Sequence, residues 1–156
     1  MAEQSPSRPI FSGRYRHALD KKHRITIPAR WRPEEGESEE EFFIVPDPTN
    51  SFLLVLPPDE FRKVEETVTN HDGLTPQERR AFIRRFYSSA QQCFSDKQGR
   101  ILLPEEHRKQ VRIKDEEELV VAGSLSRFEI WSARQWDDTF EAGASAYKKV
   151  AELVGL

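Results

Sequence analysis

One segment of the chain occurs twice, and this repeat constrains the fold more than any other feature. Residues 20–32 read DKKHRITIPARWR and residues 96–108 read DKQGRILLPEEHR, so six of thirteen positions are identical. Unrelated segments would share about one position, given ordinary residue usage. The same offset aligns the apolar residues 43–45 with 119–121. The sequence therefore predicts two copies of one structural unit.

Each copy predicts the same order of elements: strand, turn, strand, short helix and hairpin. Polar and apolar residues alternate over 24–27, which directs Ile25 and Ile27 inward and Arg24 outward, as it does Arg100 in the second copy. A proline follows each of these strands and ends it, because the residue before proline stays extended. The predicted hairpins join strands 42–45 and 52–56 in the first copy, and strands 119–122 and 128–131 in the second.

Helices are predicted after each hairpin. Residues 59–68 carry apolar side chains at helical spacing, and Thr75 with Glu78 forms a capping box that opens a second helix. Ser132 with Gln135 forms another box, and an alanine-rich tail extends beyond it. The arginines at 79, 80, 84 and 85 are expected to form the solvated face of the second helix.

These elements divide the chain into four segments. The predicted segments are a first repeat over 11–58, a helical connection over 59–86, a second repeat over 87–134 and a C-terminal helical tail over 135–156. Four or five short strands cannot close a core alone. We therefore expect the copies to interlock into one small barrel, mainly β with flanking α-helices.

Size and composition exclude several classes of protein. A chain of 156 residues is too short for a large multidomain enzyme, and it has no apolar run of the roughly 20 residues that span a membrane. Cys93 is the single cysteine and is expected to be a small buried residue, and the four histidines lack ligand spacing. We expect no metal, cofactor, small-molecule substrate or catalysis, and a cytoplasmic location.

The charges are unevenly distributed, although the formal net charge is only −3. Residues 14–32 contain seven lysines and arginines against one aspartate, and the glutamate-rich run 34–41 follows directly, where it suggests a solvated loop. Phosphate groups are bound by a local basic patch and not by the molecule as a whole, so the negative net charge does not exclude DNA binding.

The repeated Asp-Lys-x-x-Arg turn has residue types suited to DNA. Its aspartate can accept hydrogen bonds from nearby backbone amides, and its fourth residue can adopt a positive φ. Lysines can neutralise phosphates, and arginine can read guanine through two parallel hydrogen bonds. The candidate DNA-binding residues are Lys21, Lys22, Arg24, Lys97 and Arg100, and the turn-shaping residues are Asp20, His23, Asp96 and Gly99.

A structural role for the same turns is the alternative. Arg24 could pair with Asp96 and Arg100 with Asp20, which would pin the two copies together. Such pairs would explain the repeated aspartate and arginine but not the lysines or the flanking arginines at 14, 16, 30 and 32. The two roles are compatible, and the sequence leaves both open.

The two turn sequences resemble the duplicated signature of the MraZ family, bacterial transcription regulators with two SpoVT-AbrB-type units. The resemblance covers about residues 11–140 and includes Phe11-Ser-Gly-Arg14 and Arg127-Phe-Glu-Ile-Trp131. It implies a swapped-hairpin AbrB-like barrel and a closed homo-oligomeric ring. It also implies nucleoid association and binding of double-stranded DNA at repeated promoter boxes. These boxes lie upstream of the division and cell-wall gene cluster, including the regulator's own operon.

One position departs from the family pattern. The family has glycine before the motif arginine, as at Gly99, whereas the first turn has His23, which either reshapes the turn or faces the phosphate backbone. A different function, that of an AbrB-like antidote or assembly module binding a protein partner, would use the tail over residues 142–156.

Overall fold

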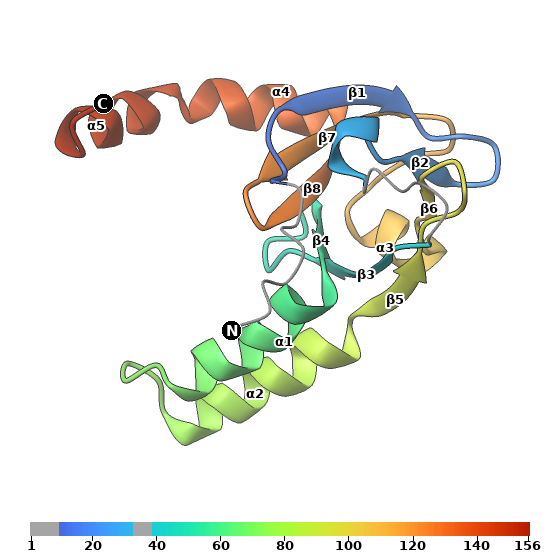
Figure 1. The fold of residues 1–156 in the computed structure, drawn as a ribbon. Coiled ribbons are helices and arrows are strands. Elements are labelled where there is room, and N and C mark those ends of the chain that lie inside the picture. The colour runs from blue at the N-terminus through green and yellow to red at the C-terminus, as the bar shows by residue number, and fades with distance from the viewer. Residues whose placement is uncertain (1–9, 33–38) are drawn as a thin grey trace, which may run out of the picture.

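The computed structural model describes residues 10–32 and 39–156 (Figure 1). The first repeat contains β1 (Arg14–Ala18), β2 (Arg24–Thr26), the short 3-10 helix η1 (Ala29–Trp31), β3 (Glu41–Pro46) and β4 (Leu53–Leu56). The second contains β5 (Gln91–Phe94), β6 (Arg100–Leu102), α3 (Glu105–Gln110), β7 (Glu118–Ser124) and β8 (Arg127–Ser132). The predicted order of strand, turn, strand, short helix and hairpin is therefore confirmed in both copies.

Strands of the two copies pair with each other. An antiparallel sheet runs in the order β1-β7-β8-β4-β3-β5, and β2 pairs with β6 in a separate two-stranded ribbon. Besides the hairpins β3–β4 and β7–β8, every ladder joins the two copies: β1 with β7, β3 with β5, β4 with β8 and β2 with β6. The predicted interlocking of the copies is thus observed, with helices flanking a β core.

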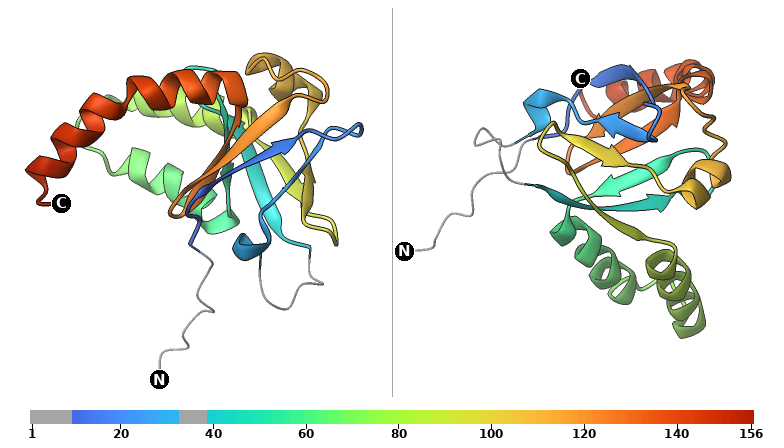
Figure 2. Two further views of the ribbon diagram at one scale, coloured as in Figure 1. Left: turned by 90° about the horizontal axis from the view of Figure 1, so that it is seen from above. Right: turned by 90° about the vertical axis from the view of Figure 1, so that its right-hand side faces the viewer.

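The predicted small barrel is not closed among the described strands. The sheet has two ends, at β1 and β5, and no ladder among the described strands joins them. The physical reason lies in β2 and β6, which have three residues each and use their ladder bonds on one another. They form a ribbon beside the sheet instead of completing it (Figure 2, right).

The core lies between the sheet and this ribbon. Ile25 and Ile101, opposite each other in the ribbon, are almost fully buried. The ring of Trp31 from η1 packs against Phe11 and Phe128, with centroids 5.5 and 5.3 Å apart. Burying these rings and isoleucines fixes which face of the ribbon points inward, because strand side chains alternate between faces.

Four longer helices lie outside this core. They are α1 (Pro58–Thr69), α2 (Pro76–Ser88), α4 (Ala133–Ala142) and α5 (Ala144–Leu153). The capping box at Thr75 is present, and the Ser132 hydroxyl accepts the Gln135 amide at the start of α4. The tail is two helices with a break at Gly143. The α1–α2 hairpin and α5 project to the left in Figure 1, away from the ribbon.

None of the helices in the described ranges is long and apolar enough to cross a membrane.

Candidate nucleic-acid interface

The two repeated turns lie at opposite ends of the β2–β6 ribbon. β2 and β6 run antiparallel, with Arg24 opposite Leu102 and Arg100 opposite Thr26. The turn before Arg24 therefore lies at one end of the ribbon, and the turn before Arg100 lies at the other end. Because the isoleucines point inward, both arginines point to the other face, where they are diagonal neighbours. Their side chains retain 25% and 29% of their exposure. The interface therefore has central arginines, with a lysine-bearing turn at each end.

Each turn is held by three hydrogen bonds to its own aspartate. One Asp20 oxygen accepts the backbone N–H groups of Lys22 and Arg24, at 2.8 and 2.9 Å, and the other accepts the Arg24 Nε at 3.0 Å. Asp96 repeats this pattern with Gln98 and Arg100, at 2.9, 2.9 and 2.8 Å. The predicted acceptance of local amides is confirmed, and each arginine is oriented by its own turn.

These bonds hold both carboxyl groups in the charged form. Hydrogen bonds from the backbone of Arg24, then of Lys22, lower the pKa of Asp20 against the opposing effect of burial. Burial raises the pKa of Asp96, but hydrogen bonds from Arg100 and Gln98 outweigh it, so that pKa is lowered as well. Hydrogen bonds to the ionised form favour that form. The aspartates therefore stay anionic where they orient the arginines.

The fourth position of each turn has the predicted positive φ. The value is 62° at His23 and 77° at Gly99, so the histidine adopts the same conformation as the glycine at the matching position of the second turn. Its ring lies against Asp115, with 3.1 Å between Nε2 and Oδ1. Sequence reasoning missed Asp115, which lies outside the repeated segment and reaches His23 only through the fold.

The alternative of structural ion pairs is partly observed. Arg24 Nη1 lies 3.7 Å from Asp96 of the other copy, which links the turns. The nearest partner of Arg100 is its own Asp96, at 2.8 Å, and within the described residues no ion pair joins it to Asp20. The arginines thus have a structural role and also remain partly exposed.

The flanking arginines have other partners. The Arg14 guanidinium lies over the Phe140 ring, 4.5 Å from its centroid. Arg16 forms ion pairs with Glu118 and with Asp137 of α4. Arg30 donates a hydrogen bond to the Tyr15 hydroxyl. The lysines at 21, 22 and 97 are exposed, and no ion pair is formed by them in the described part of the chain. Among the candidate DNA-binding residues, these lysines are therefore the cations without an ion-pair partner in the described residues.

Other sites offer little chemistry. Cys93 in β5 is only partly buried, not fully as predicted, but it packs against the core, and burial raises the pKa of its thiol to about 12. Residues 10–32 and 39–156 contain no cluster of three histidine, cysteine or acidic side chains able to hold a metal. The part of the acidic run at 34–38 lies outside the described residues.

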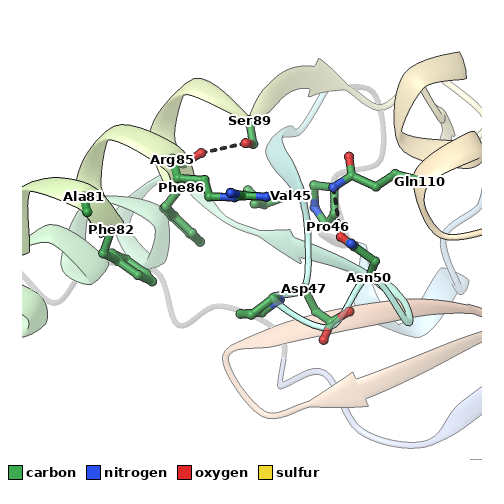
Figure 3. A pocket seen from close by; sticks show the side chains of 11 residues that line it. Val45, Pro46, Asp47, Asn50, Ala81, Phe82, Arg85, Phe86, Ser89 and Gln110 are labelled. Atoms are coloured by element: carbon green, nitrogen blue, oxygen red, sulfur yellow. Dashed lines mark hydrogen bonds between the residues drawn. The ribbon is translucent and has the colours of Figure 1, made fainter. Parts of the chain in front are cut away.

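A groove of about 380 Å³ lies between α2 and the β3–β4 turn (Figure 3). Phe82, Phe86 and Arg85 line one side, and Asn50 and Gln110, which are joined by a hydrogen bond, line the other. None of the predicted site residues lines this groove. It is therefore separate from the ribbon.

Comparison with known proteins identifies relatives over most of the chain. The family described as "MraZ protein, putative antitoxin-like" matches residues 10–85 and again 86–155. A protein of Desulfitobacterium hafniense named transcriptional regulator MraZ is 40% identical over 148 residues, which cover 94% of this chain and 99% of that relative. Proteins of the same name from Carboxydothermus hydrogenoformans and Heliobacterium modesticaldum are each 38% identical over 143 residues, covering 92% of this chain and 95% of each relative.

The fold and the site define a two-repeat β protein whose copies share strands and place two aspartate-held arginines on one exposed ribbon. With two family matches and these identities, the chain belongs to the MraZ family.

Proposed function

We propose that this chain is a transcription regulator that binds double-stranded DNA through the β2–β6 ribbon. The observation that carries the proposal is the pair of turns, in which an aspartate fixes an outward arginine. The lysines of these turns form no ion pair with any residue that the structure describes. An antiparallel ribbon can enter the major groove. In this arrangement Arg24 and Arg100 read bases while Lys21, Lys22 and Lys97 bind phosphates.

The relatives' names support a role in transcription. We extend the proposal to the repeated promoter boxes upstream of the division and cell-wall gene cluster, including the protein's own operon, and to action without catalysis at the nucleoid. A closed ring of copies would bind several boxes at once, which converts modest affinity into avidity where the spacing of boxes and subunits matches.

Fluorescence anisotropy with DNA from upstream of the protein's own gene, and with a scrambled duplex, tests the proposal. Arg100→Ala should reduce the preference for the native sequence by about 1–3 kcal/mol, because the two parallel hydrogen bonds from the arginine to a guanine are lost. Lys21→Ala should weaken binding to both duplexes equally and reduce the salt slope by about 1.

Lys148→Ala, which removes an exposed cation from α5, is the matched control and should change neither property. Equal losses from Arg100→Ala and Lys21→Ala on both duplexes would contradict the division of roles. Indifference of the wild-type protein to both duplexes at low salt would contradict DNA binding itself.

A second candidate function is that of an antidote or assembly module. The observation in its favour is the apolar surface of the tail, where Tyr147, Val150, Leu153 and Val154 are exposed. Removing residues 144–156 should abolish partner binding or oligomerisation while the affinity for a single DNA box is retained. Loss of DNA affinity in that truncated protein would argue against separate roles.

A further inference from the structure

An arginine of the first repeat covers the second turn. Lys97 and Gln98 of this turn are exposed, whereas the next residue, Gly99, is buried. The side chain of Arg32, at the end of η1, lies over this glycine: a Cβ added at Gly99 would be 2.5 Å from both the Cδ and the Nη1 of Arg32. Arg32 is itself partly exposed. Its side chain therefore lies between Gly99 and the solvent.

The first repeat holds Arg32 in this place. The neighbouring Trp31 is almost fully buried, and its Nε1 donates to the carbonyl of Ser12 at 3.0 Å, which fixes η1. The amide of Ile27, shortly before η1, donates to the carbonyl of Gly99 at 2.8 Å. The segment that carries Arg32 is thus bonded directly to the turn that Arg32 covers.

Arg108 has the matching position in the second repeat, but its side chain is used by the protein itself. Its Nε donates to the carbonyl of Leu103 at 3.0 Å, its Nη1 lies 3.5 Å from Asp115, and the side chain is only 11% exposed. The Nε of Arg32 is buried and has no hydrogen-bond partner among the residues that the structure describes. Arg32 also forms no ion pair with any of these residues.

The second turn has one lysine fewer than the first. Gln98 stands where the first turn has Lys22, so Lys97 is its single lysine. Arg32 adds a cation at this turn. Burial raises the pKa of Glu40, and the charge of Arg32 opposes this rise, yet no ion pair joins the two side chains within the described ranges. The charge of Arg32 is therefore not consumed by a described carboxylate.

We propose that Arg32 is a phosphate-binding residue of the second turn, supplied by the first repeat. This inference rests on the proposed function and adds to it a residue outside the Asp-Lys-x-x-Arg motif. A guanidinium group suits a phosphate, because its N–H groups can donate two parallel hydrogen bonds to the phosphate oxygens. Arg32 and Lys97 give the second turn two cations, as Lys21 and Lys22 give the first.

Four variants separate the charge of Arg32 from its packing. Arg32→Met and Arg32→Gln remove the charge and keep a stem over Gly99, whereas Arg32→Lys keeps the charge without the planar guanidinium. Arg80→Gln is the matched control, because Arg80 is an exposed arginine of α2, which projects away from the ribbon. Thermal unfolding of each variant checks that the fold is retained.

The first measurement needs no DNA. In NMR spectra of the free protein, Arg32→Gln should shift the amide signal of Gly99 and leave that of His23 unchanged, because Arg32 covers only the second turn. Arg80→Gln should shift neither signal. An unchanged Gly99 signal in Arg32→Gln would overturn the placement of Arg32, whatever the protein does with DNA.

The second measurement is the affinity for the upstream and the scrambled duplex at several salt concentrations. Arg32→Met and Arg32→Gln should each weaken binding to both duplexes equally and reduce the salt slope by about 1, as Lys97→Ala should. Arg32→Lys and Arg80→Gln should keep the wild-type slope.

A wild-type slope in Arg32→Met and Arg32→Gln would overturn phosphate binding by Arg32. An equal loss of slope in Arg32→Lys would do the same, because the shape of the side chain and not its charge would then be responsible. Absence of DNA binding by the wild-type protein at low salt would overturn the proposed function and this inference with it, while the NMR comparison still decides where Arg32 lies.

Discussion

Asp20 and Asp96 are the residues that shape both turns. Each accepts two backbone amides and the Nε of its arginine, so replacing either carboxylate removes three hydrogen bonds at once. Local spacing alone predicted this role, since the bonds span at most four residues. The contact of His23 with Asp115 could not be predicted in this way, because it spans 92 residues and depends on how the two repeats pack.

The lowered pKa values of these aspartates predict a dependence of stability on pH. A carboxyl whose pKa is lower in the folded than in the unfolded chain stabilises the fold above the unfolded value, near 3.9. This stabilisation is lost as pH falls through the folded values. Thermal unfolding of the wild-type protein between pH 7 and pH 3 should therefore show a midpoint that falls steeply below about pH 4.

Asp96→Asn should have a shallower decline over the same range, because the amide cannot lose or gain this charge. Glu141→Gln, at an exposed position in α4, is the control and should follow the wild type. Parallel curves for Asp96→Asn and the wild type would contradict the role given to this carboxylate.

The elements themselves were largely predictable. Alternation in residues 24–27 gave the buried isoleucines, and the capping box at Thr75 gave the start of α2, because both signals are local. The open sheet was not predictable from such signals, since closure depends on whether β2 and β6 bond to the sheet or to each other. The break at Gly143 was also missed.

The cap of α2 supports a prediction at this scale. Thr75 accepts the Glu78 amide, and the Glu78 side chain accepts the Thr75 amide in return. Thr75→Ala should lower the free energy of unfolding by about 1 kcal/mol in a denaturant titration, because a helix amide loses its partner. DNA affinity should be unchanged, since α2 projects away from the ribbon.

Thr67→Ala, at an exposed position within α1, is the control for this change and should cause no comparable loss. A similar destabilisation by both variants would contradict a specific contribution of the Thr75 cap to the free energy of unfolding.

Whole-molecule architecture follows from the pairing of strands across the repeats. The duplication predicted that neither copy would close a core alone, and each outer strand indeed has its partner in the other copy. The segment boundaries 11–58, 59–86, 87–134 and 135–156 remain a prediction about how the chain is divided. The closed ring likewise remains a proposal.

Residues 1–85 and 86–156, produced separately, should each fail to unfold cooperatively, because β1, β2 and β3 of one half lose β7, β6 and β5 of the other. Circular dichroism on heating tests this, and mixing the halves should restore a cooperative transition. A cooperative transition in either half alone would contradict the prediction.

The shared strands also order events during synthesis on the ribosome. Domains generally fold from the N-terminus as they emerge, but here the first repeat leaves the ribosome while β5, β6 and β7 have yet to be made. A nascent chain therefore carries its first turn without the ribbon that would present it. A chain that ends before β6 therefore lacks the ribbon, and under the proposed function we expect it not to bind DNA in competition with the full-length protein.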